Sequence, residues 1–453
     1  MVKSCIKISI IVGFMAFFLT SVVNAKDSGW KEAQNKMFEK IGLKSGEVIG
    51  KDNWKKVEGL VPDDMVKWVR EGKVIMNIGE FGYDASNDAE WDEYGLKHNV
   101  GKYSLNKEGV IIETATGKYP KWVYGYPFPD IDLKKDPDAG IKFMHNRDIT
   151  RGRDGSFKSP FTVEWIGKDG FERVLQNNYY RYNFWGTTET KDDGNANDMM
   201  FMEVTVVVAP YDVSGTAQLT YRKIDGSDDQ LYVYIPAIRR TKRMSGANRS
   251  DPFMGSDFTI DDGNGWLGNT SKMKWTYIKE KIGLMAIAKY SANDYTHMTQ
   301  EDDGHWKASS DVEGIKSGWQ VKEKHTQAPW SPVTCVWVPR KFHIVTCVPE
   351  DPFYNMGKME FWIDKKSLWG EYKLMWDIAG EYWRTGAYMP QFMKWDKITQ
   401  SSNMHLFYDV KTDHSTVLRS SGKNIFGRDL FYEYNLKNMK KKFSVSRVGT
   451  WTK

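Results

Sequence analysis

The chain has 453 residues, of which 40% are hydrophobic and 14% aromatic, and its formal net charge is +5 at pH 7. A chain of this length predicts a large hydrophobic core and, by length alone, two or three domains, although large β architectures often form a single one. The nearly balanced charge argues against a nucleic acid partner.

Residues 1–25 have the pattern of a cleavable signal peptide. Lys3 and Lys7 precede an apolar run at residues 8–23, and small residues precede the expected cleavage site. An uncleaved N-terminal anchor is the alternative, although the run is short for a spanning helix of about 20 residues. Cys5 lies before the apolar run, so it is not placed for lipid attachment. Cleavage would remove the two lysines and lower the net charge from +5 to +3, and we expect a soluble exported protein.

Residues 26–72 are predicted to be helical. Apolar residues recur at the spacing of one helix face, namely Trp30, Ala33, Met37 and Ile41. A second helix is predicted to begin at Pro62, because the first turn leaves that amide unpaired, and to end at Gly72. These helices could simply pack against the core or form a lid over a sheet.

Two short segments before residue 160 allow two interpretations each. Phe128 lies between Pro127 and Pro129, which would hold its ring on a stiff extended segment, either lining a cavity or filling the core. Residues 147–156 contain three arginines, two aspartates and two glycines. This composition suits an anion site, because arginine offers two parallel donors and glycine exposes backbone amides, or a glycine-rich turn with local ion pairs.

A series of β-strands follows. Apolar residues alternate with polar ones repeatedly between residues 161 and 236, and Asp169-Gly170 and Asp225-Gly226 are strong turn signals. Successive hairpins at this spacing predict an antiparallel meander. Further alternating runs, at residues 273–288 and 359–410, extend the β pattern toward the C-terminus.

Residues 231–266 combine a strand with clustered charges. Tyr232 and Tyr234 alternate with apolar residues before Pro236, which closes the strand. Three arginines follow, and three aspartates lie beyond them around Phe258. These charged residues are Arg239, Arg240, Arg243, Asp257, Asp261 and Asp262. They could form a structural ion-pair network or a polar rim at the mouth of an apolar cavity.

Two cysteines remain beyond the signal peptide. Cys335 and Cys347 are equidistant from Lys341, so a hairpin that turns at residues 339–341 would place them opposite each other. An oxidising compartment would then allow a disulfide, and two free buried cysteines are the alternative.

Enzyme signatures are absent. The chain has no HExxH, GxSxG, P-loop or CxxC motif, and none of its eight histidines is four residues from another. We therefore predict no catalytic residue, no metal and no cofactor. The abundance of carboxylates and tryptophans leaves a glycosidase as an alternative, since that chemistry needs only two acids and aromatic walls.

Several runs together resemble a known family. They are Tyr-Ile-Pro-Ala-Ile-Arg-Arg-Thr-Lys-Arg at 234–243, Ser-Asp-Phe-Thr-Ile-Asp-Asp at 256–262, Gly-Tyr-Pro-Phe-Pro at 125–129 and the segment 354–364. The chain resembles, over most of residues 40–450, the domain-of-unknown-function 1329 family of Gram-negative envelope proteins, which is related to the lipoprotein-localisation factors. The resemblance implies a fold and a compartment but no established activity. It also implies an association with large membrane exporters of hydrophobic compounds.

The predicted fold is α+β, with residues 73–453 as one domain. It contains one large curved antiparallel β-sheet, an incomplete β-barrel, with helices at its mouth. Aromatic side chains are the candidates for lining its interior, namely Phe128, Tyr232, Tyr234, Phe258, Trp275 and Trp376. The candidates for its rim are Arg239, Arg240, Arg243, Asp257, Asp261 and Asp262.

The expected function is that of a periplasmic carrier or acceptor for a lipid or another hydrophobic molecule, free or attached to the outer membrane. An inner-membrane exporter or an outer-membrane protein would be its partner. Two alternatives stay open. One is a secreted glycan-active hydrolase or carbohydrate-binding protein, and the other is an adaptor of an outer-membrane assembly with a solid core and no ligand.

Overall fold

The computed structural model describes residues 29–86, 89–245, 249–309, 312–321, 327–395, 398–424 and 426–451. The expected signal peptide lies outside these residues. Among the described residues, no helix is both long enough and apolar enough to cross a membrane.

Sixteen strands form one sheet. Its first part is an antiparallel meander of β5 (Ser156–Gly167), β6 (Gly170–Asn183), β7 (Met199–Ala209), β8 (Ala217–Lys223), β9 (Gln230–Ile235) and β10 (Arg240–Met244). The hairpins predicted at Asp169-Gly170 and Asp225-Gly226 connect β5 to β6 and β8 to β9. The meander predicted from the alternation is therefore confirmed.

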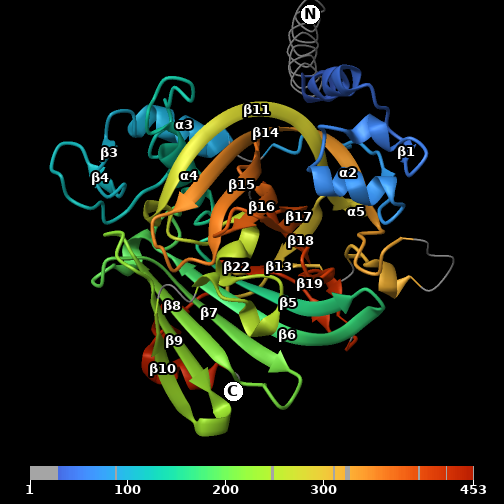
Figure 1. The fold of residues 1–453 in the computed structure, drawn as a ribbon. Coiled ribbons are helices and arrows are strands. Elements are labelled where there is room, and N and C mark those ends of the chain that lie inside the picture. The colour runs from blue at the N-terminus through green and yellow to red at the C-terminus, as the bar shows by residue number, and fades with distance from the viewer. Residues whose placement is uncertain are drawn as a thin grey trace, which may run out of the picture.

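A second antiparallel run completes most of the sheet. It consists of β11 (Met273–Ala288), β14 (Cys335–Pro349), β15 (Met356–Asp364), β16 (Gly370–Asp377), β17 (Tyr382–Lys394), β18 (Ile398–Asp409) and β19 (His414–Arg419). β19 pairs with β5 and so joins the two runs. In Figure 1, β11 and β14 arch over one end of the molecule, and β5–β10 form the opposite end.

Three short strands connect the two runs a second time. β12 (Thr296–Gln300), β13 (Trp306–Ala308) and β22 (Glu433–Tyr434) lead from β17 to β5, and the β12–β17 pair is parallel. The strands thus form a ring, while β10 and β11 stand at the two ends of the strand order. The prediction of a large curved sheet that forms an incomplete barrel is confirmed.

Helices cover both faces of the β14–β16 sheet. α2 (Asp63–Arg70) packs its apolar face with Phe342 and Tyr372. On the other face, α4 (Ala139–Thr150) packs with Val345 and Phe361. The remaining helices are residues 29–41, α3 (Ala89–His98) and α5 (Lys289–Asn293), and the remaining strands are β1 (Val48–Ile49), β2 (Met76–Asn77), β3 (Tyr103–Leu105), β4 (Ile111–Glu113), β20 (Gly422–Lys423) and β21 (Asp429–Leu430).

The predicted cysteine hairpin is wrong. Residues 335–349 form the single strand β14, so Cys335 and Cys347 stand near its two ends, roughly 40 Å apart along a strand that rises about 3.3 Å per residue. Both are buried and free, which excludes the predicted disulfide. Pro339 does not make a turn because it lies opposite Leu284, whose amide donates instead to the carbonyl oxygen of Leu60 at 2.8 Å.

Candidate ligand-binding site

A cavity lies between one face of β5–β7, the segment 253–267 and β18. About 160 Å³ is open inside it, which is room for on the order of ten water molecules. We call this space the inner cavity. Polar groups on its wall come from Ser159, Thr399, Gln400, Ser401, Ser402 and Ser420, and aromatic groups come from Phe157, Phe161, Tyr179, Phe258, Trp369 and Tyr432.

Four arginines and two carboxylates also line the inner cavity. Arg147 and Arg151 are one helical turn apart at the C-terminal end of α4, where the helix dipole favours positive charge. Arg153 follows them, so all three arginines of residues 147–156 reach the cavity. Both interpretations of residues 147–156, the anion site and the turn with ion pairs, involved these arginines, and the fold places them on the cavity wall.

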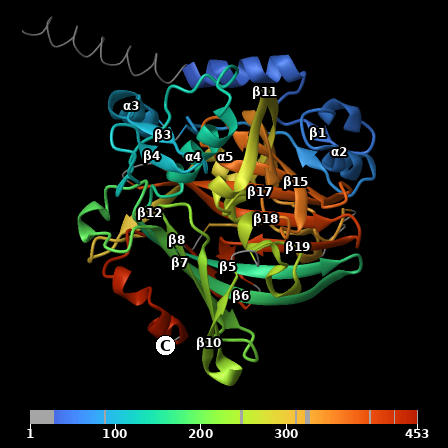
Figure 2. The ribbon, with the colours of Figure 1, turned by 60° about the vertical axis from the view of Figure 1, so that its left-hand side comes forward.

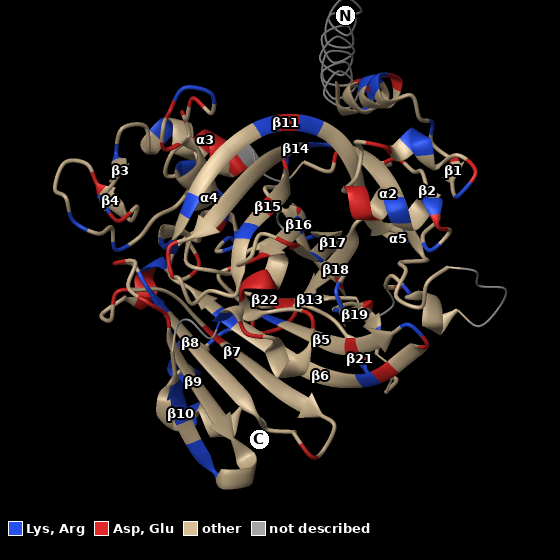
Figure 3. Cartoon of the chain, in the orientation of Figure 1, with Lys and Arg blue, Asp and Glu red and all other residues tan. Residues whose placement is uncertain are grey.

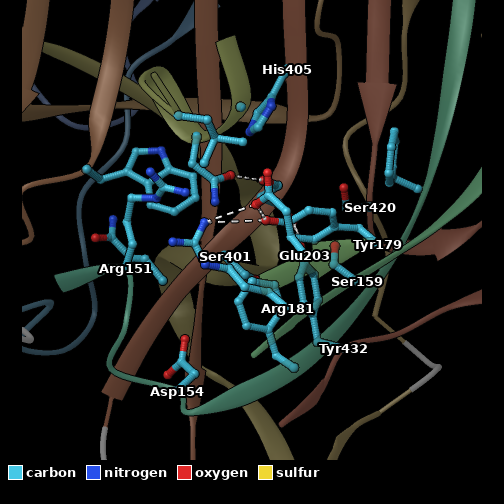
Figure 4. A pocket seen from close by; sticks show the side chains of 18 of the residues that line it. Arg151, Asp154, Ser159, Tyr179, Arg181, Glu203, Ser401, His405, Ser420 and Tyr432 are labelled. Carbon is cyan, nitrogen blue, oxygen red and sulfur yellow. Dashed lines mark hydrogen bonds and ion pairs between the residues drawn. The ribbon is translucent and has the colours of Figure 1, made fainter. Parts of the chain in front are cut away.

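The Arg181 side chain belongs to a closed hydrogen-bonded group. It forms an ion pair with Glu203 at 3.3 Å and donates to Asn183 at 2.7 Å, and the Tyr179 hydroxyl donates to Glu203 at 2.5 Å. Figure 4 shows Arg181, Glu203 and Tyr179 pointing toward one another. Glu203 also has Arg249 within 4.0 Å, so arginines on two sides compensate its negative charge.

Arg147 holds the segment that covers the cavity. Its guanidinium donates to the carbonyl oxygen of Trp266 at 2.5 Å and to that of Asn264, and it has Asp148 within 3.4 Å. Asn264 lies in the 3-10 segment η6 (Ile260–Gly265), and Trp266 follows it directly. Since Arg147 is only 2% exposed, its role in the folded protein is to anchor η6 over the cavity.

Arg151 differs from the other arginines. It donates to the Trp266 carbonyl oxygen at 2.9 Å, its Nε has no partner, and among the described residues no carboxylate lies within ion-pair distance of it. Burial and the positive charges of Arg181 and Arg147 hold the pKa of Arg151 well below its ordinary value. Because a guanidinium stays protonated in proteins, the wall carries an uncompensated positive charge.

Two residues on the cavity wall have buried polar atoms that lack partners. Both ring nitrogens of His405 and the indole Nε1 of Trp369 have no hydrogen-bond partner among the described residues. His405 is 4% exposed, so bulk water does not satisfy these atoms. Buried polar groups of this kind are normally paired. These nitrogens belong to residues on the cavity wall but have almost no accessible surface of their own and no hydrogen bond within the described part of the chain.

An apolar groove continues from the inner cavity. We call it the outer groove; its volume is about 270 Å³ and its wall includes Val207, Leu231, Val233, Met244, Pro252 and Met254. Four residues line both spaces, namely Thr205, Gln218, Phe253 and Ile260. The same face of β6–β10 therefore changes from charged and polar near Arg181 to apolar toward β10.

The six aromatic residues predicted to line the interior are not brought together. Phe258 lines the inner cavity. Tyr232 and Tyr234 lie on the opposite face of β9 and pack against the C-terminal segment near Phe443 and Trp451. Phe128 and Trp275 are buried in the core beside α4, and Trp376 is half-buried against Lys358 and Tyr382.

The predicted rim is also separated. Arg239, Arg240 and Arg243 are exposed on the β9–β10 hairpin. The aspartates are buried and pair with cations from elsewhere in the chain. These pairs are Asp257–His414 at 2.6 Å, Asp261–Arg249 at 2.6 Å and Asp262–Lys373 at 2.5 Å. The three aspartates thus form structural ion pairs, as in the ion-pair interpretation of this segment. Their partners, however, are not the three arginines of the β9–β10 hairpin.

Several cavity residues were not predicted, above all Arg181, Glu203 and His405. A signal did exist for the first two. In β6 and β7 they stand at positions that share a face with Tyr179 and Thr205, so each places a charge on a face whose neighbours are largely uncharged. No local sign in the sequence indicated that residues 399–405 line the cavity. β18 lies beside the cavity only because long-range strand pairing forms the ring of strands.

The buried His405 side chain makes a pH-dependent contribution to stability. Burial lowers its pKa to about 3, so the folded state stays neutral where an unfolded histidine, with a pKa of about 6.5, takes up a proton. The contribution is present above pH 6.5 and is lost as the pH falls toward 3. We expect His405→Phe to reduce the slope of unfolding free energy against pH by about 1.4 kcal/mol per pH unit near pH 5.

Urea titrations at pH 8 and pH 5 measure this effect. At pH 8 the imidazole is neutral in both states, so the difference there reports packing alone. His343, whose pKa burial lowers to about 4, acts in the same direction and remains in the variant. An unchanged pH 8-to-pH 5 difference would show that His405 is not held neutral.

The comparisons with known proteins identify the family. A family model described as "Protein of unknown function (DUF1329)" matches residues 48–447. The chain belongs to the DUF1329 family. The resemblance found in its sequence motifs is thus confirmed, and no curated protein matches the chain.

Solved structures similar to this DUF1329 member share little sequence with it. A putative outer membrane lipoprotein-sorting protein domain from Vibrio parahaemolyticus has 15% identity and a TM-score of 0.46, with 69% of this chain and 100% of that chain covered. A DUF1329 family protein from Desulfovibrio piger has 16% identity and a TM-score of 0.45, with the same coverage. A LolA superfamily protein from Nitrosomonas europaea has 10% identity and a TM-score of 0.38, with 67% and 97% covered.

Proposed function

We propose that this protein is a non-enzymatic periplasmic carrier of an amphiphile that bears an acidic group. The acidic group binds in the inner cavity against Arg151, and the apolar part lies in the outer groove. Binding is non-covalent. An inner-membrane exporter or an outer-membrane protein supplies or receives the ligand.

The observation that carries the proposal is the uncompensated positive charge of Arg151 beside an open space. Arg151 is partly buried, and a charge that is partly removed from water without an opposite charge destabilises the empty protein. Binding of an anion would offset that destabilisation. Arginine presents two parallel donors that match a carboxylate or a phosphate. The indole N–H of Trp369 and the single N–H of the neutral His405 ring lack partners among the described residues, and a small rotation of either side chain would let it donate a further hydrogen bond to the same group.

The outer groove supports an amphiphile rather than a small free anion. It adjoins the inner cavity through Thr205, Gln218, Phe253 and Ile260, and its wall is mostly aliphatic and methionine-containing. Methionine suits adaptable binding surfaces, and apolar pockets with a few convergent polar groups are typical ligand sites. An acyl chain in this groove would bury apolar surface while its acidic end reaches Arg151.

A glycosidase fits the cavity less well. Such an enzyme needs two carboxyl groups, one of which protonates the leaving oxygen. The carboxylates on the wall are Asp154 and Glu203. Glu203 already faces Arg181, Arg249 and the Tyr179 hydroxyl, so its oxygens are not available to a sugar. An adaptor without a ligand would be expected to have a filled core, whereas this protein has an open space beside a guanidinium that has no carboxylate partner in the described part of the chain.

Native mass spectrometry of the mature protein purified from its own periplasm tests the proposal. We expect one bound acidic amphiphile per chain, recovered and named after organic extraction. The emptied protein should then take up a fluorescent fatty acid, and an uncharged alcohol of the same chain length should bind far more weakly. A clean mass without uptake of either probe would support the adaptor instead, and release of sugar from envelope glycans would support the hydrolase.

A further inference from the structure

Two hairpin tips project side by side from the end of the sheet that carries β10. One is the turn at residues 210–216 between β7 and β8, and the other is residues 236–239 between β9 and β10. Because Ala217 pairs with Tyr234, the two tips are neighbours, and both views show them at the lower end of the molecule (Figures 1 and 2). Each tip exposes a large apolar side chain, Tyr211 at 96% and Ile238 at 48%.

Basic residues gather behind these apolar tips. Arg239, Arg240, Lys242 and Arg243 are all exposed, and among the described residues none of them forms an ion pair. Figure 3 shows this basic strand at the end of the sheet. Asp212, in the first tip, is the acidic residue of the two turns. The hairpin therefore combines exposed apolar points with a largely unneutralised positive charge.

Protection of the sheet edge explains only part of this pattern. Charged side chains on β10 would keep the edge from pairing with another chain. They do not explain why Tyr211 and Ile238 are exposed at the tips. Nor do they explain Arg239, which has a φ of 50°, a conformation that glycine adopts at no steric cost. The backbone conformation at position 239 therefore does not account for the presence of an arginine.

The first of the two tips adjoins the outer groove. Thr216, in the same turn as Tyr211, lines the groove together with Val207 and Val233. Met244, at the end of β10, lines it as well, and Lys242 and Arg240 share its face of the strand. A surface bound at the tips would thus meet the apolar groove directly.

We propose that the two tips dock on an anionic phospholipid membrane. The arginines and Lys242 contact lipid phosphates, and Tyr211 and Ile238 enter the headgroup region, where aromatic residues with a polar end are favoured. The docked protein presents the opening of the outer groove to the lipid surface. This inference goes beyond the carrier function, since a protein can bind its ligand without touching a membrane.

Cosedimentation with vesicles tests the docking. The protein, residues 26–453, is mixed with vesicles of phosphatidylglycerol and phosphatidylethanolamine or of phosphatidylcholine alone. We expect binding to the anionic vesicles that falls as salt is added. The variant R239G/R240Q/K242Q/R243Q should lose binding by more than a hundredfold, because each basic residue near an anionic surface contributes about fivefold. Glycine at position 239 also relieves the left-handed backbone, so this variant should fold.

A matched control removes the same charge elsewhere. Lys31, Lys40, Lys44 and Lys51 are exposed in the N-terminal segment, far from the tips in Figure 1, and K31Q/K40Q/K44Q/K51Q should bind vesicles within a fewfold of the original protein. Y211S/I238S, which keeps the charge, should also weaken binding.

Two results would overturn the docking: no binding to anionic vesicles, or an equal loss in the two charge variants. Binding of a fluorescent fatty acid in solution should be unchanged in the hairpin variant. Loss of vesicle binding with ligand binding retained separates this inference from the carrier function.

Discussion

Replacing Arg151 with methionine should abolish high-affinity binding of an acidic amphiphile and leave the empty protein at least as stable as before. Loss of a buried charge partner weakens binding by about 2–5 kcal/mol, or roughly thirtyfold to several thousandfold. The empty protein loses only one hydrogen bond, to the Trp266 carbonyl oxygen, and Arg147 still donates to that oxygen. Removal of a partly buried charge that has no carboxylate partner among the described residues should leave its unfolding free energy unchanged or raise it, because no opposite charge is left unpaired.

Displacement of a fluorescent fatty acid and urea unfolding measure the two effects of Arg151→Met. The matched control is Arg70→Met, because Arg70 is exposed on α2 outside the cavity, over the Trp54 ring. It should leave the affinity unchanged. Equal affinity in the Arg151 variant and the original protein would remove Arg151 from the site.

Arg181 provides a useful contrast to Arg151. Both line the inner cavity, but Arg181 compensates Glu203 at 3.3 Å. Its replacement would leave Glu203 with a weaker partner and destabilise the fold, whereas replacement of Arg151 leaves no orphaned carboxylate. The cavity thus contains cations that maintain the structure and one that is available to a ligand.

Replacing Lys373 with methionine should cost about 3–5 kcal/mol of unfolding free energy, the usual cost of removing one partner of a buried ion pair. The side chains of Lys373 and Asp262 are both 0% exposed and 2.5 Å apart. Asp262 also accepts from the Thr259 amide at 2.6 Å and so organises η6. Since η6 covers the inner cavity, the variant should also bind ligand more weakly.

Chemical denaturation checks the size of the Lys373 effect. Lys365→Met is the control, because its pair with Glu280 is 43% and 41% exposed and exposed pairs contribute at most about 1 kcal/mol. The double variant K373M/D262N should recover part of the loss, since it leaves no buried charge unpaired. A loss of less than 1 kcal/mol in Lys373→Met would mean that the pair is accessible to water in solution.

The local elements of the fold could be predicted from the sequence. Alternation and the Asp-Gly turns predicted the β5–β9 meander, because strand period and turn conformation depend on neighbouring residues only. The family could be recognised for a similar reason, since its motifs are contiguous runs such as residues 234–243. The hairpin predicted at residues 339–341 is wrong because β14 pairs with β11, a strand far away in the sequence, and continues through Pro339.

The candidate site depended on tertiary structure. Alternation predicted that Tyr232 and Val233 face opposite sides of β9, but it could not indicate which side meets the C-terminal segment and which the outer groove. Likewise, the sequence of residues 147–156 contained the arginines of the site without showing which of them has a carboxylate partner. Side-chain period is a local property, whereas burial and charge compensation depend on residues far away in the chain, so only the folded molecule distinguishes Arg151 from its neighbours.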